Sequence, residues 1–294
     1  CAQYALGKIY RDGQGVEKDI QKAVALFTLA ATKENSFAAF ALGKLYLAGD
    51  AALPRDPAAA LKWLTYAAEL GNQFAQYRLG KLLLKGDDGI PKDVITAIRW
   101  LTAAAKQENG YAEYALALVY LTGEDAPKDS VKALSLLKRS AGRGNQFAQY
   151  RLGKLLLQGE DAPKDVKAAI RWLTAAAEQG NQYAQYALGK LYLLGKEVPK
   201  DRSSAIKWFQ LAADQGNEYA QYFLKHMDDR LGQPPVAAVI SLFHHLANIF
   251  QEQNQPPPSG GVRVAVDRKL LRKIKAKKIA QGHKADDHEP EMQL

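Results

Sequence analysis

Hydrophobic positions along the first three quarters of the chain follow the period of an α-helix, in two patterns that alternate. In the first pattern, apolar residues fall at i, i+4, i+7 and i+8, as in Ala75, Leu79, Leu82 and Leu83. In the second, they fall at i, i+3, i+4, i+7 and i+8, as in Ala97, Trp100, Leu101, Ala104 and Ala105. Each pattern places one apolar stripe along a helix. No strand pattern interrupts them, so the sequence predicts an all-α fold.

The two patterns recur together at a step of 36 or 37 residues. One block, NQFAQYRLGKLLL, occurs at both Asn72–Leu84 and Asn145–Leu157. A glycine of the first pattern and a bulky residue of the second recur at the same step, at Gly7, Gly43, Gly80, Gly153 and Gly189, and at Leu26, Trp63, Trp100, Leu136, Trp172 and Trp208. Such a period is typical of a solenoid, in which neighbouring units bury each other's stripes. We expect the glycines to let helices approach closely and the tryptophans to fill the gap beside them.

Short polar motifs mark where the helices begin and end. Pro-Lys-Asp precedes the second helix in four units, and Asp is a good N-cap because its carboxylate accepts hydrogen bonds from unpaired backbone N–H groups. Gly-Asn follows that helix, where Gly suits a left-handed C-terminal residue and Asn caps the next helix. These residues are Asp93, Asp129, Asp165 and Asp201, and the glycines Gly71, Gly144, Gly180 and Gly216.

The pattern A-x-x-x-L-G-x-x-Y…G…D-x-x-x-A…A-A…G-N resembles the Sel1-like repeat, a relative of the tetratricopeptide repeat. The resemblance covers Ala2 to Leu231, as six full copies and a half. It implies a right-handed α/α superhelical solenoid whose first helices line a concave face and which acts as an adaptor. In the fourth copy, Ala117 replaces the glycine and Leu136 replaces the tryptophan. We therefore expect looser packing in that copy.

The sequence predicts four regions. Residues 1–231 form the solenoid, and residues 232–254 carry one more helical stripe, which we expect to cap its end. Residues 255–261 are rich in Pro and Gly and form a linker. Residues 262–294 form a basic, flexible tail. The chain begins in the middle of a helical pattern without Met, so we expect it to be the C-terminal part of a longer protein.

Composition narrows the function classes. The chain has no run of 18 or more apolar residues, so no membrane span is predicted. Its single cysteine, Cys1, excludes a disulfide framework and fits a reducing compartment such as the bacterial cytoplasm. We find no glycine-rich phosphate loop, no Ser/His/Asp order and no isolated carboxylate pair. The segment is therefore predicted to be non-enzymatic and to need no cofactor.

One face of the first helices is a candidate ligand site. On a helical wheel, an aromatic residue and a lysine four positions later fall together, away from the core positions. The candidate residues are Tyr4, Lys8, Phe40, Lys44, Tyr77, Arg78, Lys81, Tyr150, Arg151, Lys154, Tyr186 and Lys190; Tyr114 with Leu118 is the exception. Such a ladder suits an extended acidic peptide or a single nucleic-acid strand. The alternative is that each tyrosine packs on the neighbouring repeat and each lysine is solvated.

The basic tail is a second candidate. Val262–Lys284 carries nine Lys or Arg and one acid, Asp267. The residues expected to contact nucleic-acid phosphates are Arg263, Arg268, Lys269, Arg272, Lys273, Lys275, Lys277 and Lys278. The basic stretch has no aromatic residue to stack on bases, so sequence-specific binding is not expected. The alternative is a solvated tail with weak affinity. His283 and His288, with three neighbouring acids, have no rigid frame and do not predict a metal site.

The C-terminal segment carries a second resemblance. The motifs Leu242-Phe-His-His-Leu246, Pro256-Pro-Pro-Ser-Gly-Gly261 and Lys278-Ile-Ala-Gln-Gly-His-Lys-Ala-Asp-Asp-His288 are similar to the C-terminus of MobL-type plasmid mobilisation relaxases. This resemblance implies an accessory arm that tethers a nicking complex to a protein partner, with the tail near DNA. No catalytic residue is carried over. The competing hypothesis is a generic Sel1-type adaptor that binds a protein or peptide and has no nucleic-acid role.

Overall fold

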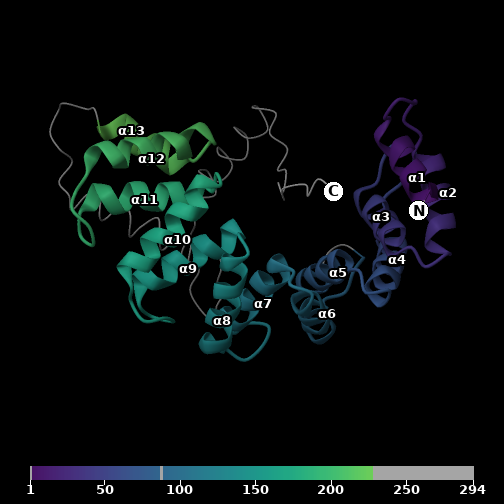
Figure 1. The fold of residues 1–294 in the computed structure, drawn as a ribbon, viewed down its shortest axis with the longest axis horizontal. Coiled ribbons are helices and arrows are strands. Elements are labelled where there is room, and N and C mark those ends of the chain that lie inside the picture. Colours follow the sequence, from purple (N-terminus) through teal and green to yellow (C-terminus); the bar gives the residue numbers. More distant parts are fainter. Residues whose placement is uncertain (1, 87–88, 228–294) are drawn as a thin grey trace, which may run out of the picture. The chain divides into compact units, whose positions relative to one another are not determined.

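The computed structural model describes residues 2–86 and 89–227, which form thirteen α-helices and no strand longer than an isolated bridge (Figure 1). The bounds are α1 Ala2–Asp12, α2 Ile20–Ala31, α3 Ser36–Ala48, α4 Pro57–Glu69, α5 Gln73–Lys85, α6 Val94–Lys106, α7 Gly110–Thr122, α8 Ser130–Gly142, α9 Gln146–Gln158, α10 Val166–Glu178, α11 Gln182–Leu194, α12 Arg202–Asp214 and α13 Glu218–Met227. The all-α repeat solenoid is confirmed. The predicted cap at 232–254, linker at 255–261 and tail at 262–294 lie outside the described residues.

Helices pair in chain order. Each odd-numbered helix from α1 to α11 packs against the even-numbered helix that follows it, and this pair makes one repeat; α13 begins a seventh. We call the first helix of a pair helix A and the second helix B. Helix B also packs against helix A of the next repeat, so the core is continuous from one repeat to the next.

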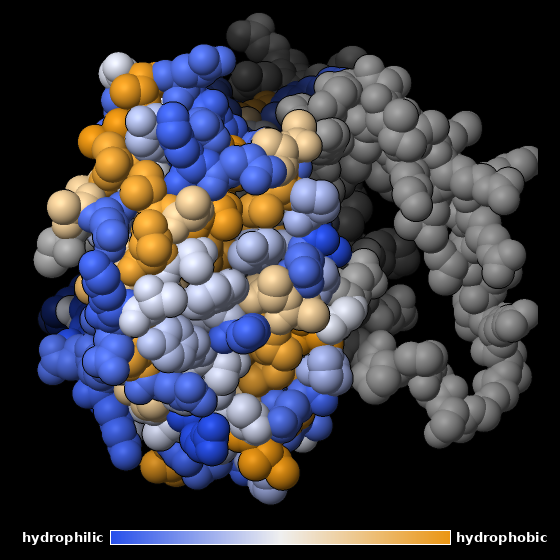
Figure 2. Space-filling view, turned by 90° about the vertical axis from the view of Figure 1, so that its right-hand side faces the viewer, coloured by the Kyte–Doolittle hydropathy of each residue, from blue (hydrophilic) through white to orange (hydrophobic). Residues whose placement is uncertain are grey.

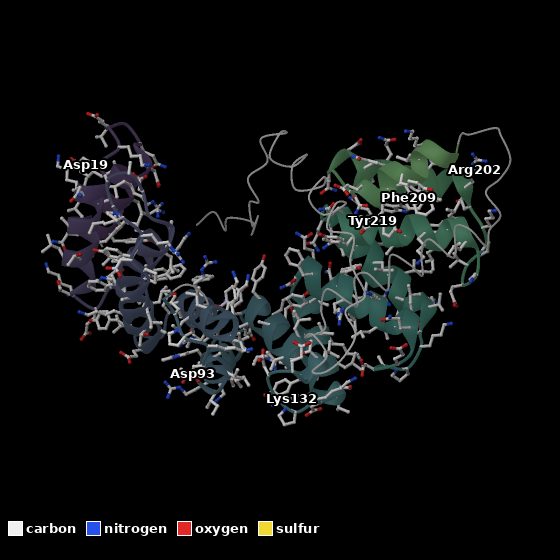
Figure 3. All side chains as sticks on the ribbon, turned by 180° about the vertical axis from the view of Figure 1, so that it is seen from behind. Asp19, Asp93, Lys132, Arg202, Phe209 and Tyr219 are labelled. Carbon is white, nitrogen blue, oxygen red and sulfur yellow. The ribbon has the colours of Figure 1, made fainter. Side chains whose placement is uncertain are left out.

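Aspartates start every helix B, as predicted. The residue before each helix is extended, and its carboxylate accepts a hydrogen bond from the backbone N–H three residues later, for example Lys22 N to Asp19 at 2.9 Å and Thr96 N to Asp93 at 3.0 Å. Both caps are labelled in Figure 3. These bonds satisfy backbone donors that a helix start leaves unpaired.

Glycine and asparagine join the repeats. Gly71, with φ of 84°, has the left-handed conformation predicted for it, and Asn72 accepts hydrogen bonds from Phe74 N and Ala75 N. At two other junctions, Glu34 and Glu108 take the same conformation, with φ of 60° and 66°. A residue with a Cβ is strained there, so these two junctions are less favourable than the glycine ones.

The helix-A glycines bring the two helices of a repeat together, but the tryptophans do not fill the gap. A Cβ built on Gly80 would lie 2.6 Å from Leu101 Cγ, and one on Gly153 would lie 2.7 Å from Leu173 Cγ. The residue after each tryptophan is therefore the one that packs on the glycine. Trp100 and its equivalents lie one residue before this position, so they point in another direction around the helix and are only half-buried. The prediction that tryptophan fills this space was wrong.

The fourth repeat shows no loosening at the replaced positions. Ala117 and Leu137 are fully buried, and Leu136 is 9% exposed. The extra methyl group of Ala117 is therefore accommodated within a closed core, contrary to the looser packing that we expected.

Loops between helix A and helix B add polar contacts between repeats. Lys18 forms an ion pair with Asp50 at 3.0 Å, and its counterparts Lys128 and Lys164 reach Asp161 and Glu197 at 2.8 Å. Each lysine belongs to one repeat and its acid to the next. The lysine directly before the aspartate N-cap thus links neighbouring repeats, both in Glu17-Lys18-Asp19 and in the Pro-Lys-Asp motifs.

Candidate ligand-binding face

Aromatic rings from successive helices A pair across every junction between repeats. Each pair joins an aromatic residue of one repeat to the ring near the start of the next helix A, with centroids 5.9–6.3 Å apart. The pairs, which we call the aromatic ladder, are Tyr4–Phe37, Phe40–Phe74, Tyr77–Tyr111, Tyr114–Phe147, Tyr150–Tyr183 and Tyr186–Tyr219. The ladder shows that helices A lie side by side from repeat to repeat.

The ladder tyrosines that precede the lysines, Tyr77, Tyr150 and Tyr186 among them, are half-buried, whereas Tyr183 is exposed. Their contacts are those of the alternative interpretation, in which each tyrosine packs on the neighbouring repeat, and not those of a ring placed away from the core. Tyr77 and Tyr114 pack against the core. The ring centroid of Tyr186 lies 5.8 Å from that of Phe209 and 5.9 Å from that of Tyr219, and Phe209 and Tyr219 are both labelled in Figure 3. Burial raises the pKa of the Tyr114, Tyr150 and Tyr186 hydroxyls. A helical wheel describes one helix by itself. It therefore does not show that the next repeat covers the side of the tyrosine ring that faces away from its own repeat.

A row of lysines lies one helical turn beyond the ladder. We call Lys8, Lys44, Lys81, Lys154 and Lys190 the cation row. Lys8 Nζ lies 6.0 Å from the Tyr4 ring centroid and Lys44 Nζ lies 6.0 Å from that of Phe40, so aromatic and cation share one face as predicted.

Lysines of the row in repeats five and six interact with neighbouring positive charges. Burial lowers the pKa of Lys154, and the charge of Arg151 lowers it further. Burial likewise lowers the pKa of Lys190, and the charge of Lys154 in the preceding repeat adds to the effect. Lys154 and Lys190 are therefore close enough to influence each other's charge.

The row has a different environment in the first two repeats. Arg11 donates hydrogen bonds to Asp12 and holds the pKa of that carboxyl below its usual value, and the charges of Lys8 and Lys44 lower it further. Asp12 thus partly balances the positive charge near Lys8 and Lys44.

The fourth repeat interrupts the row. Leu118 stands where the other repeats have lysine, and Ala115 stands where repeats three and five have Arg78 and Arg151. Both residues are half-buried. The face is therefore positive on both sides of an apolar step.

Beneath the ladder lies a set of buried glutamines that the sequence did not suggest. Gln76 of α5 donates to Ala68 O in the preceding repeat at 3.0 Å and accepts from Gln107 at 2.8 Å. The same geometry recurs at Gln149 with Ala141 and Gln179, and at Gln185 with Ala177 and Gln215. We call this arrangement the glutamine relay; it fixes α5, α9 and α11 against the repeat that precedes each of them.

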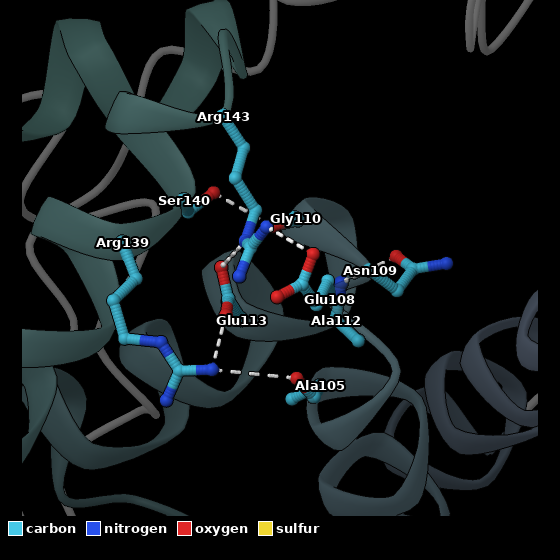
Figure 4. Close-up of polar contacts among 9 residues, drawn as sticks. All are labelled: Ala105, Glu108, Asn109, Gly110, Ala112, Glu113, Arg139, Ser140 and Arg143. Carbon is cyan, nitrogen blue, oxygen red and sulfur yellow. Dashed lines mark hydrogen bonds and ion pairs between the residues drawn. The ribbon is translucent and has the colours of Figure 1, made fainter.

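The fourth repeat replaces this relay with charges (Figure 4). Glu113, fully buried, takes the place of the glutamine and forms ion pairs with Arg139 at 2.7 Å and Arg143 at 3.3 Å. A carboxylate has no proton to donate, so the Ala105 carbonyl that a glutamine would reach accepts instead from Arg139 Nη2 at 3.4 Å. Arg143 also pairs with Glu108 at 2.9 Å.

Other parts of the described chain offer weaker candidates. A hollow of about 670 Å³ lies along α4, where Lys62, Tyr66 and Glu69 line it together with Thr32. Figure 2 views the side on which α1–α4 lie in Figure 1, where hydrophobic and hydrophilic residues are mixed in small groups. Among residues 2–86 and 89–227 there is no group of three potential metal ligands and no helix long and apolar enough to cross a membrane.

The predicted nucleic-acid contacts from Arg263 to Lys278 lie outside the described residues, as do His283 and His288. They remain predictions from the sequence.

Comparison with known proteins agrees with the repeat architecture. The model of the Sel1 repeat matches residues 2–35, 36–72, 73–109, 110–145, 146–181 and 182–217. The structure is similar to that of a Sel1 repeat protein from Oxalobacter formigenes, with 34% identity and a TM-score of 0.70 over 77% of this chain and 65% of that one. It is also similar to a protective antigen present in uropathogenic Escherichia coli strains, with 31% identity and a TM-score of 0.70 over 79% of this chain.

The chain spans about half the length of that antigen, 49%, and less than two thirds of the Oxalobacter protein. No curated protein sequence matches the chain. Six contiguous repeat matches, together with the helix pairs that they encode, decide the family. The chain belongs to the Sel1 repeat family.

Proposed function

We propose that this chain is a non-catalytic scaffold that binds an extended segment of a partner protein along the aromatic ladder and the cation row. The observation that supports this most directly is that an aromatic ring and a lysine share one face of helix A, with Lys8 Nζ 6.0 Å from the Tyr4 ring centroid and Lys44 Nζ 6.0 Å from that of Phe40. The same spacing of aromatic residue and lysine recurs in every full repeat except the fourth. Regularly spaced cations beside half-buried rings favour a long, anionic ligand over a compact small molecule.

A protein segment suits this face better than a single nucleic-acid strand. The ladder rings pair with one another at centroid distances of 5.9–6.3 Å, and Tyr77 and Tyr114 also pack on the core, so these two rings are partly covered and less suited to stacking on bases. Phe37 and Tyr183 are the exposed rings of the ladder. The face combines lysines with apolar side chains such as Leu118, and a polypeptide can contact both.

Selection from a displayed peptide library against the full chain tests the proposal. The affinity of selected peptides is then measured by fluorescence anisotropy for the chain and for the double variant Lys81→Glu/Lys154→Glu. We expect affinity to fall by about a hundredfold, since two charge-assisted contacts are replaced by repulsion. The matched control is Lys106→Glu/Lys167→Glu, which changes the net charge equally at exposed positions on helices B. Equal loss in both double variants would overturn the proposal.

A second candidate function rests on the charge of Val262–Lys284 and on the resemblance to MobL-type relaxases. We propose it as the finer alternative: an accessory region of a plasmid mobilisation relaxase, in the bacterial cytoplasm, whose tail lies near DNA. Deleting residues 262–294 is then expected to abolish most DNA affinity. The full chain is expected to show a log–log salt slope on the order of −3 to −6, for about four to seven phosphate contacts. Unchanged DNA binding after the deletion would exclude the tail as the cause.

A further inference from the structure

The junction into the fourth repeat contains the only Asn-Gly pair of the chain, Asn109-Gly110. In other repeats, the asparagine that caps helix A is followed by Ser, Gln or Glu, as in Asn35-Ser36, Asn72-Gln73 and Asn217-Glu218. Glycine has no side chain to shield its backbone nitrogen, so that nitrogen can approach the preceding asparagine side chain closely. For this reason Asn-Gly is the asparagine pair that deamidates most readily.

The fold does not require glycine at position 110. Gly110 begins α7 without a left-handed φ. A Cβ built on it would lie 3.6 Å from Arg143 Cβ and 3.8 Å from Ser140 Oγ, which are ordinary contact distances. A glutamine, as at Gln73 and Gln146, would therefore fit.

The native structure holds Asn109 in a geometry that cannot react. Deamidation begins when Gly110 N attacks Asn109 Cγ, which requires both atoms on the same side of the Asn109 Cα–C bond. With ψ of 102°, Asn109 is extended and the Gly110 nitrogen points away from the side chain. Asn109 Oδ1 also accepts a hydrogen bond from Ala112 N at 3.0 Å. The backbone and the side chain must both move before the ring can close.

Helix α8 holds the residues on both sides of Asn109 (Figure 4). Ser140 Oγ donates to Gly110 O at 2.6 Å, and Arg143 pairs with Glu108 at 2.9 Å. The backbone at Asn109 cannot rotate far while both contacts are in place.

The ion cluster strengthens the same attachment. Glu113, one turn after Asn109, is fully buried and forms ion pairs with Arg139 at 2.7 Å and Arg143 at 3.3 Å. Breaking such a pair leaves a buried charge uncompensated, so opening this junction is costly. A group held in this way reacts at a rate that follows the population of the opened form.

We propose that Asn109 is a modification site at which deamidation is controlled by the ion cluster of the fourth repeat. In the opened junction, Gly110 N loses its proton and bonds to Asn109 Cγ, and the side-chain nitrogen leaves as ammonia. Water then opens the succinimide ring. Cleavage of the new N–Cγ bond gives aspartate, and cleavage between Gly110 N and the Asn109 backbone carbonyl carbon gives isoaspartate. This site is independent of the proposed function.

The two products affect the fold differently. Aspartate keeps the cap, since Asp93 and Asp129 cap helices B through the same hydrogen bond, at 3.0 Å and 2.9 Å. Isoaspartate adds a methylene group to the main chain and displaces the cap from α7. Either product adds a negative charge next to Glu108 in the sequence.

Timed incubation of the full chain at mildly alkaline pH, followed by peptide mass spectrometry, tests the proposal. In urea, Asn109 is expected to deamidate faster than Asn72, Asn145 and Asn181, each of which precedes glutamine. In native buffer, its rate is expected to be about a hundredfold lower than in urea, because reaction requires a buried ion pair to break.

Variants of the cluster test the control. Arg139→Ala is expected to raise the native rate at Asn109 about a hundredfold and to leave Asn145 unchanged. Ser140→Ala, which removes the hydrogen bond to Gly110 O and no charge, is expected to raise it about tenfold. The matched control, Gly110→Gln, is expected to slow Asn109 to the rate of Asn145 in urea.

Each outcome decides one part of the proposal. If Asn72, Asn145 or Asn181 reacts faster than Asn109 in urea, the modification site is overturned. If Asn109 reacts as fast in native buffer as in urea, control by the fold is overturned. Urea unfolding shows which variants are folded, and Ser140→Ala decides if Arg139→Ala is not. Folded variants that leave the native rate unchanged overturn control by this junction.

Discussion

The junction into the fourth repeat and the junction into the fifth have the same backbone geometry but different chemistry. At the fifth, Gln149 connects the Ala141 carbonyl to Gln179 through its own donor and acceptor. At the fourth, Glu113 lacks the donor, and two arginines supply both the missing hydrogen bond and the opposite charge. One position can therefore be occupied by an amide or by a carboxylate, provided that the surrounding residues change with it.

The glutamine relay and the ion cluster differ in how much stability is lost when one of their side chains is removed. A neutral relay that loses one amide leaves an unpaired polar group, which costs on the order of 1–3 kcal/mol. A buried carboxylate that loses its partner leaves an uncompensated charge, which costs more. The fourth repeat should thus be the most sensitive junction of the described solenoid, although its core is as well closed as the others.

The largest expected effect comes from removing the closer arginine. Arg139→Ala removes both the 2.7 Å ion pair with Glu113 and the hydrogen bond to Ala105. We expect the free energy of unfolding to fall by about 3 kcal/mol, because the fully buried Glu113 carboxylate keeps only the longer contact with Arg143. Urea unfolding followed by circular dichroism measures the change, and hydrogen exchange in α7 and α8 locates it.

The control for this prediction gives the fourth repeat the residues that the fifth repeat has at the same three positions. The triple variant Glu113→Gln/Arg139→Ala/Arg143→Gln places the equivalents of Gln149, Ala175 and Gln179 in the fourth repeat. It is expected to unfold close to the parent chain, because a complete relay replaces a complete ion cluster. A triple variant as unstable as Arg139→Ala would show that the two chemistries are not interchangeable.

Exchanging glycine and alanine where helix A contacts helix B is expected to change the free energy of unfolding by an intermediate amount. Gly153→Ala brings a methyl group to 2.7 Å from Leu173 Cγ and 3.1 Å from Ala169 O. We expect a loss of about 1–2 kcal/mol from overpacking, although alanine is the better helix former. In the fourth repeat, where alanine is native, Ala117→Gly should lose about 1 kcal/mol through helix propensity alone. Differential scanning calorimetry compares the pair, and a stabilised Gly153→Ala would mean that the two helices separate readily.

The helix pairs and their caps were readable from the sequence because they depend on contacts within one repeat. The aspartate caps and the glycine at φ 84° occupy the predicted positions. The sequence left two environments open for the ladder tyrosines, and it did not predict that Leu101, rather than Trp100, packs on Gly80. Both depend on rotations of a few tens of degrees between packed helices, which periodicity does not resolve.

The ion cluster of the fourth repeat is visible in the sequence as two positions that change together. Aligning the repeats gives Gln76, Glu113, Gln149 and Gln185 in one column, and Gln107, Arg143, Gln179 and Gln215 in another. The two columns change together in the fourth repeat, and a joint change from amide pair to ion pair is typical of residues in contact. Only the structure, however, identifies Arg139 as the donor that replaces the glutamine amide.

The smallest expected effect concerns the two strained glutamates at repeat junctions. Glu34→Gly is expected to raise the free energy of unfolding by about 1 kcal/mol, since glycine adopts a φ near 60° without strain. Glu108→Gly should gain less at neutral pH, because it also removes the ion pair with Arg143. Arg143 lowers the pKa of Glu108, so that pair stabilises the fold above the usual glutamate pKa and is lost as the pH falls through the lowered one. The stability gains of the two glycine variants should therefore become equal at acidic pH in parallel urea titrations. A difference between the two gains that persists at acidic pH would mean that Glu108 stabilises the fourth repeat by some means other than its charge.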